Sequence, residues 1–97
     1  MKDIKEIEKE LTKHKHELFA KFKIKKLGLF GSYVTGEQKK NSDLDILVEF
    51  TETPGMFKYL NLEESLENII GINVDLVMKT SLKQHIEKQI LSEVVYL

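Results

Sequence analysis

Two aspartates one residue apart, Asp43 and Asp45, are the residues of this sequence best suited to chemistry. They stand at the start of an apolar run, residues 44–50, that is typical of a β-strand. Because side chains alternate along a strand, both carboxylates point to one face and Leu44 points to the other. Neighbouring carboxylates repel each other unless a cation lies between them, and carboxylate oxygens suit Mg²⁺. The pair therefore predicts a magnesium site; the alternative is a pair of strand-edge acids that cap nearby N–H groups.

A Gly31-Ser32 turn follows an earlier apolar strand, residues 24–30, and precedes the aspartates. If Ser32 begins a helix, its hydroxyl and the free N–H groups behind it can hold a phosphate; the alternative is a plain N-cap. Ser42, directly before Asp43, either caps the turn that sets the aspartates or contacts a nucleotide. A phosphate cradle followed by a metal-binding carboxylate pair is the arrangement of a phosphoryl-transfer site.

A third aspartate, Asp75, interrupts the short apolar run from Val74 to Val77. An unpaired carboxylate buried inside such a strand is costly, so Asp75 needs an edge position or a partner. The chain has only four aspartates against twelve glutamates, and three of the four belong to this constellation. We therefore expect Asp75 to join the other two aspartates at one site.

The motif as a whole resembles the minimal nucleotidyltransferases of the DNA polymerase β superfamily. The family pattern is roughly G-S-x-A-R-G, a short spacer, S-D-x-D and a third Asp. The resemblance covers the chain from about Ile24 to the C-terminus, with one departure, because Val34-Thr35 stands where the family usually has Ala-Arg. The matching residues are Gly31-Ser32, Gly36, Ser42-Asp43-x-Asp45 and Asp75.

The resemblance implies a site and a mechanism. Asp43, Asp45 and Asp75 would be the catalytic residues and the ligands of two Mg²⁺ ions, with ATP as substrate. The third aspartate of the family assists the attacking hydroxyl, and that residue would here be Asp75. The nucleotide-binding residues would be Gly31, Ser32 and Ser42.

The resemblance also implies a partner. Minimal family members are commonly paired with HEPN-domain proteins, as antitoxins that neutralise a HEPN ribonuclease, some of them by adding AMP to it. The expected function is Mg-dependent transfer of AMP, or another nucleoside monophosphate, from a nucleoside triphosphate to such a toxin, within a homo- or hetero-oligomer. The alternative is a binding-only antitoxin whose catalysis is impaired by the Val34-Thr35 change.

Composition favours one small domain spanning residues 1–97. There is no cysteine for a disulfide framework, no apolar run near membrane-spanning length and no signal-like start, so we expect a cytoplasmic protein without membrane insertion. All fifteen basic residues are lysines. Residues 1–40 hold eleven Lys and six acids, a balance of +5, and residues 41–97 hold four Lys and ten acids, a balance of −6. The Lys-rich segment 13–26 is either a solvated surface or a docking site for RNA or an acidic partner.

Periodicity predicts an α/β (α+β) fold of the order αβαβαβα. Its small mixed sheet would have three or more strands, with helices packed mainly on one face and the acids on the open face. In the second long helix we expect Phe57, Leu60, Leu66, Ile69 and Ile70 to share a core face. Gly28 indicates the close approach of another element. The expected helices are residues 2–20, 32–38, 56–70 with Gly71 as the stop, and one capped by Ser81; the expected strands are residues 24–30, 44–50 and 73–78.

Overall fold

The computed structural model describes residues 3–97 and begins with the long helix α1, Ile4–Phe22. Asp3 is its N-cap, because the Asp3 carboxylate accepts a hydrogen bond of 2.9 Å from the backbone N–H of Glu6. The helix ends at Lys23, which adopts the left-handed conformation. The expected helix over residues 2–20 is confirmed with shifted ends; Lys2 lies outside the described residues.

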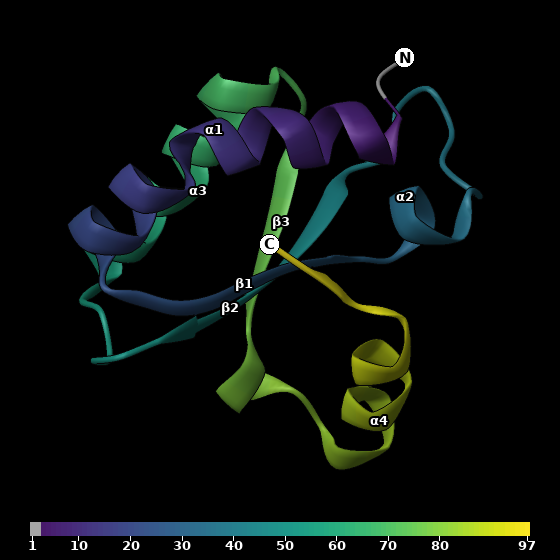
Figure 1. The fold of residues 1–97 in the computed structure, drawn as a ribbon. Coiled ribbons are helices and arrows are strands. Elements are labelled where there is room, and N and C mark those ends of the chain that lie inside the picture. Colours follow the sequence, from purple (N-terminus) through teal and green to yellow (C-terminus); the bar gives the residue numbers. More distant parts are fainter. Residues whose placement is uncertain (1–2) are drawn as a thin grey trace.

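A mixed four-stranded sheet crosses the molecule beneath α1 (Figure 1). Its strands are β1 (Ile24–Phe30), β2 (Leu44–Phe50), β3 (Val74–Met78) and β4 (Val95–Tyr96), in the order β3-β2-β1-β4. β2 pairs antiparallel with β1 and parallel with β3, and β4 pairs antiparallel with β1. The expected bounds of β1 and β2 are confirmed, and β3 begins one residue later than expected.

The main core lies between this sheet and the two long helices, α1 and α3 (Met56–Ile70). Gly71 ends α3 in the left-handed conformation with a φ of 75°, as expected of a glycine C-cap. Side chains alternate between the two faces of a strand. The side chains of β2 and β3 that face this core are Leu44, Ile46, Val48, Val74 and Leu76.

The expected core face of α3 is wrong at its N-terminal end. Phe57 is 83% exposed and Leu60 is 50% exposed. The buried stripe is instead Leu62, Leu66 and Ile70, which recur every four residues and so lie along one side of the helix. Phe57 lies five residues before Leu62 and Leu60 lies two residues before it. Neither spacing is close to a whole number of α-helix turns, so both side chains point away from that side.

The last helix, α4 (Gln84–Glu93), packs on the opposite face of the sheet (Figure 1). There Phe30, Leu47 and Ile90 form a second, smaller apolar cluster, so the face that we expected to be open is partly covered. The expected cap of this helix at Ser81 is also wrong. Ser81 ends a short 3₁₀ helix, η1 (Lys79–Ser81), and its hydroxyl donates to the Met78 carbonyl at 2.7 Å, whereas the N-cap of α4 is Lys83.

The short strand β4 was not expected from the sequence, although Gly28 indicated that some element approaches β1 there. A Cβ atom on Gly28 would lie 2.5 Å from Val94 Cγ2 and 3.1 Å from the Tyr96 ring, which confirms the close approach. Gly28 therefore lets the chain end lie against the sheet and holds the end of α4 in place. Among the described residues, no helix is both long and apolar enough to cross a membrane.

Candidate active site

Asp45 and Asp75 lie directly beside each other on neighbouring strands. They are register partners in the parallel pair β2–β3, and neighbouring strands are about 4.8 Å apart. Residues in register point to the same face, which here is the face opposite the main core, since Leu44 and Val74 are both buried in that core. Of the two alternatives expected for Asp75, an edge position or a partner, the structure shows the edge position, because β3 is an edge strand and Asp75 is exposed.

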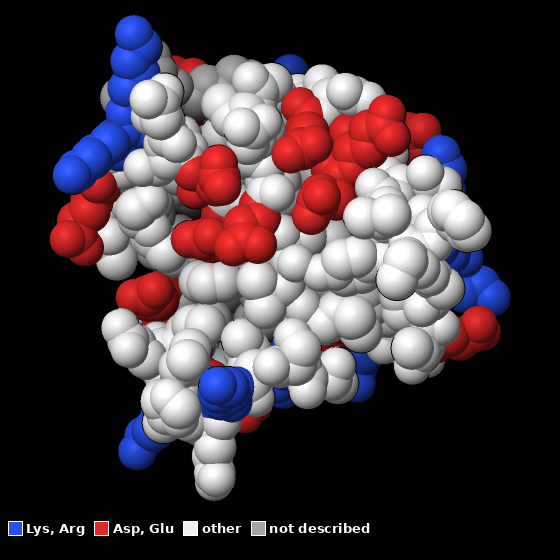
Figure 2. Space-filling view, turned by 180° about the vertical axis from the view of Figure 1, so that it is seen from behind, with Lys and Arg blue, Asp and Glu red and all other residues white. Residues whose placement is uncertain are grey.

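Asp43 lies directly before β2 and completes the acidic group. Its negative charge is one of the causes that raise the pKa of Asp45. Asp43 also borders an open cavity of about 390 Å³, whose other lining residues are Tyr33 of α2 and residues of the loop before β2 and the turn before β3. Figure 2 shows red carboxylates gathered on the side of the molecule turned away from α1, with blue lysines mainly toward its outline.

The electrostatics of this group favour a cation. The pKa of the half-buried Asp45 is raised from 3.8 to about 6, first by burial and then by the negative charges of Asp75, Asp43 and Glu93. A carboxyl group in such surroundings keeps its proton to a higher pH than an ordinary aspartate unless positive charge compensates it. Among the described residues, no three His, Cys, Asp or Glu side chains are already gathered into a metal cage. The residues nevertheless fit Mg²⁺, because their oxygen donors are of the preferred kind and a cation relieves their mutual repulsion.

Gly31 connects β1 to the short helix α2 (Ser32–Thr35) and lies against Asp45. Its φ of 81° and ψ of −155° belong to a region that is essentially restricted to glycine. A Cβ atom at this position would overlap Asp45 Oδ2 and lie 2.9 Å from Asp45 Cγ. The backbone conformation and the contact with Asp45 therefore each require glycine at position 31. The fold places the expected Gly31-Ser32 turn directly against Asp45.

Ser32 is the first residue of α2, and the N-cap of that helix is Gly31 rather than Ser32. Within residues 3–97 the Ser32 hydroxyl makes no hydrogen bond, whereas its carbonyl accepts from Thr35 Oγ1 at 3.4 Å and from the Glu37 N–H at 2.9 Å. The helix ends at Thr35, with Gly36 as the C-cap, and is shorter than the expected 32–38. Of the two residues that depart from the family pattern, Val34 packs against the core and Thr35 is exposed.

Ser42 caps the turn before Asp43. Its side-chain oxygen accepts the Lys39 N–H at 2.8 Å, and its own N–H donates to the Lys39 carbonyl at 3.0 Å. The Tyr33 hydroxyl donates to the Ser42 carbonyl at 3.3 Å. Tyr33 is buried, so this contact ties the loop that carries Asp43 to α2 and the core.

Two residues at the site were missed in the sequence. Glu93, at the end of α4, accepts the Gly31 N–H at 3.3 Å and contributes to the raised pKa of Asp45. Tyr59 of α3 donates a hydrogen bond to the carbonyl of Leu76, the neighbour of Asp75. Burial and the charges of Glu63 and Asp75 raise the pKa of this phenol. Neither residue belongs to a local motif, so no signal in the sequence could have found them.

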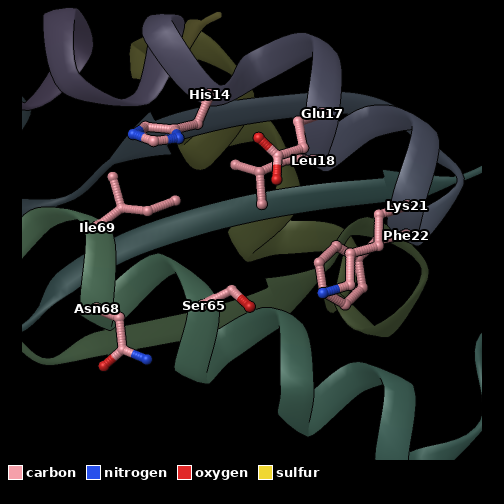
Figure 3. Close-up of a pocket in the computed structure, with 8 residues that line it drawn as sticks. All are labelled: His14, Glu17, Leu18, Lys21, Phe22, Ser65, Asn68 and Ile69. Carbon is pink, nitrogen blue, oxygen red and sulfur yellow. The ribbon is translucent and has the colours of Figure 1, made fainter.

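A second cavity, of about 230 Å³, lies between α1 and α3, away from the acids. Figure 3 shows His14, Glu17 and Lys21 of α1 beside this gap, opposite Ser65, Asn68 and Ile69 of α3. None of its lining residues comes from the strands or turns that carry the aspartates. This cavity is therefore separate from the candidate site.

Comparisons of the whole chain with known proteins identify its family. The model of the nucleotidyltransferase domain family matches residues 4–97. This chain belongs to the nucleotidyltransferase domain family. It is 54% identical over 96 residues to the protein adenylyltransferase MntA of Thermococcus cleftensis, a match that covers 99% of this chain and 97% of that protein.

Solved structures show the same fold. A minimal nucleotidyltransferase matches with a TM-score of 0.77 and 30% identity, over 94% of this chain and 95% of that one. A chain of a toxin–antitoxin complex with AMP-PNP matches with a TM-score of 0.70 and 28% identity, over 87% of this chain and 69% of that one. A chain from the tri-AMPylated Shewanella oneidensis HEPN toxin in complex with MNT antitoxin matches with a TM-score of 0.66 over 93% of this chain and 70% of that one; at 23% identity it supports the fold alone.

Proposed function

We propose that this nucleotidyltransferase transfers AMP from ATP to a hydroxyl group of a protein partner, and that the partner is a HEPN-domain toxin. The observation that carries the proposal is the register pairing of Asp45 with Asp75 next to Gly31, in a chain 54% identical to a protein adenylyltransferase. A related chain in a toxin–antitoxin complex with AMP-PNP supports both the nucleotide and the kind of partner.

In the proposed reaction the hydroxyl oxygen of the acceptor forms a bond to the α-phosphorus of ATP. The bond from that phosphorus to the oxygen leading to the β-phosphate breaks, so the products are an AMP ester and pyrophosphate. Asp75 accepts the hydroxyl proton. In the Gly31-Ser32 turn the Gly31 N–H is bonded to Glu93, so the Ser32 hydroxyl is the group that holds a phosphate oxygen, and Ser42 keeps the loop before Asp43 in place for the nucleotide.

Asp43, Asp45 and Asp75 are the residues that would hold Mg²⁺. When bound there, Mg²⁺ would neutralise triphosphate charge and lower the pKa of the attacking hydroxyl. The chain itself has no arginine, so any phosphate contact from a cationic side chain must come from a lysine, which offers a point charge in place of a bidentate fork.

Replacing Asp75 with Asn tests this proposal. We expect Asp75→Asn to abolish incorporation of labelled AMP from ATP into the HEPN-domain protein, because the proton acceptor and one metal ligand are lost. The exposed side chain is not needed for folding, so the melting temperature without metal should stay the same or rise slightly, since one of several mutually repelling charges is removed. Glu37→Gln, another exposed acid but one on the far side of Gly36, is the control and should leave incorporation unchanged.

The outcomes separate the roles of the residue. Transfer at the parent rate would remove Asp75 from the site, and an unfolded variant would make it a structural residue.

Binding of Mg²⁺ with ATP should raise the melting temperature of the parent by ligand linkage, and the Asp43→Asn/Asp45→Asn variant should lose that rise.

A binding-only antitoxin is the second candidate function, and Thr35 is the observation that favours it. The arginine of the family pattern is replaced by a short, exposed side chain at the end of α2, which carries no charge for a phosphate. A parent chain that binds the HEPN-domain protein but transfers no AMP with Mg²⁺ or Mn²⁺ would support this second candidate over the first.

A further inference from the structure

Three large apolar side chains are exposed together at the start of α3. Met56 is 77% exposed, Phe57 83% and Leu60 50%. Residues three and four positions apart are neighbours on a helix surface, so Leu60 adjoins both Phe57 and Met56, and the three form one group, which we call the α3 apolar patch. The core stripe of α3 lies on another side of the helix. Packing within the described chain therefore does not account for these side chains, and clustered exposed apolar groups are typical of an interaction site.

A cavity of about 300 Å³ adjoins the α3 apolar patch. Met56 belongs both to the patch and to the cavity wall, together with Tyr59 of the same helix and Met78 at the end of β3. The remaining wall is formed by Pro54 and Gly55, directly before the helix. The surface thus combines protruding apolar side chains with a hollow that can receive an apolar side chain of a partner.

The α3 apolar patch is held in a fixed position relative to the candidate site. The hydroxyl of Tyr59 donates to the carbonyl of Leu76, the residue after Asp75. Met78, in the cavity wall, is three residues beyond Asp75 on the same strand, which corresponds to roughly 10 Å of strand length. Met78 faces the main core whereas Asp75 faces the opposite side of β3, so a protein surface that rests on the patch reaches the aspartates by extending around this edge strand.

The charges around the patch indicate what kind of surface fits. Glu63 and Glu64 follow Leu60 by three and four residues and so lie beside the patch, whereas Glu52 pairs with Lys23 and Glu67 accepts the Val74 N–H. A second copy of this chain would meet the patch through the same surface, as in a two-fold dimer, and would bring the glutamates beside the patch together. Like charges brought together across an interface are costly. A partner with an apolar centre and Lys or Arg at its rim complements the patch.

We propose that the α3 apolar patch and its cavity dock the protein that receives AMP, through an apolar side chain surrounded by basic residues. This inference rests on the proposed function, because it assumes a protein acceptor. It assigns to α3 the task of binding the acceptor, and leaves nucleotide and metal to the turn and strands that carry Gly31 and the aspartates.

The test uses the double variant Phe57→Ala/Leu60→Ala and the purified HEPN-domain protein of the proposed function. Both side chains are exposed, so the melting temperature should match that of the parent. We expect the KM for the HEPN-domain protein and its directly measured Kd to rise on the order of tenfold or more, as for loss of a central aromatic contact. The kcat at saturating acceptor and the KM for ATP should be unchanged.

Ile86→Ala is the matched control, because Ile86 is also an exposed apolar helix residue, 41% exposed, but lies on α4. It should leave the acceptor KM unchanged. A double variant with parent-like acceptor KM and Kd would overturn the docking inference while leaving the proposed function intact. A parent that neither binds nor modifies the HEPN-domain protein would overturn the proposed function itself. If the parent sediments as a dimer and the double variant as a monomer, the patch binds a second copy and the inference is wrong.

Discussion

At the residue scale, Asp45 combines several competing effects. It is half-buried, it lies beside Asp75, and its Oδ2 lies against Gly31. Burial and the neighbouring acids raise its pKa to about 6. The same surroundings that destabilise the free carboxylate provide oxygen donors for a cation, so the folded chain holds a group that is poorly suited to stability and well suited to metal binding.

The raised pKa leads to a prediction about stability. Because folding raises the pKa of Asp45 from 3.8 to about 6, the folded state holds this proton more tightly than the unfolded chain. The resulting stabilisation is complete below the unfolded value of 3.8 and is lost as the pH rises through the folded value. Asn has a similar shape and no charge, so in EDTA Asp45→Asn should melt at a higher temperature than the parent at alkaline pH.

The difference in melting temperature between Asp45→Asn and the parent should shrink as the pH falls toward the unfolded value of 3.8. Thermal melts of both proteins across that range measure it directly. Glu52→Gln is a suitable control, because Glu52 is exposed and pairs with Lys23 at the other end of β2. A difference for Asp45→Asn that does not change with pH would mean that the charge of Asp45 does not destabilise the folded state.

At the element scale, the end of the chain positions part of the site. Val94 and Tyr96 pack over Gly28 of β1, and this packing sets where α4 ends. Glu93, the last residue of α4, consequently reaches the Gly31 N–H, 62 positions earlier in the sequence. Strand β1 therefore has two roles. It leads into the Gly31-Ser32 turn at its end, and at Gly28 it provides the surface against which Val94 and β4 pack.

Gly28→Ala tests this docking. Its new methyl group would lie 2.5 Å from Val94 Cγ2, so β4 or the Val94 side chain must shift. We expect a loss of about 1–3 kcal/mol in the free energy of unfolding, as for overpacking of a core. Urea titration measures the loss, and hydrogen exchange should show faster exchange of the Leu97 N–H, which donates to the Leu27 carbonyl at 2.9 Å.

Gly55→Ala is the matched control for Gly28→Ala. No atom lies within 4 Å of a Cβ built on Gly55, and its φ is −71°. Ala is a weaker N-cap than Gly, which lowers stability, but it also reduces the entropy of the unfolded chain, which raises stability. The free energy of unfolding should therefore change by no more than about 0.5 kcal/mol. Equal stability of the two variants would contradict the role of Gly28 in packing β4.

At the scale of the whole molecule, charge is divided between the two parts of the chain. Residues 1–40 carry a balance of +5 and residues 41–97 a balance of −6. In the structure the acidic part includes the candidate site and α3, whereas the lysines lie mainly toward the outline of that face (Figure 2). The candidate site and the helix that we propose for the acceptor therefore both belong to the acidic part of the chain.

Salt should weaken binding of the HEPN-domain protein. Screening shortens the Debye length from about 10 Å at 0.1 M to about 3 Å at 1 M salt, so attraction between the acidic face and a basic partner falls with salt. Titrations at several salt concentrations should give a rising Kd, with the slower association expected of lost electrostatic steering. A Kd that is flat across this range would leave only apolar docking, and a Kd that depends on RNA would direct attention to the Lys-rich segment 13–26.

The sequence by itself determined the local elements and the positions of the candidate aspartates within them. The bounds of β1, β2 and α3 follow from periodicity and from glycine stops such as Gly71, which act over a few residues. The Gly31-Ser32 turn and the spacing of Asp43 and Asp45 are likewise local, so their places could be predicted without a fold.

Only the tertiary structure decided which distant residues meet. The register that sets Asp75 beside Asp45, the arrival of Glu93 at Gly31 and the exposure of Phe57 all depend on long-range pairing. A two-residue strand such as β4 is too short to show periodicity, and an apolar helix residue looks the same in sequence whether a sheet or solvent lies opposite it. Strand order and helix placement result from burial of the whole core, and for that reason no local pattern contained them.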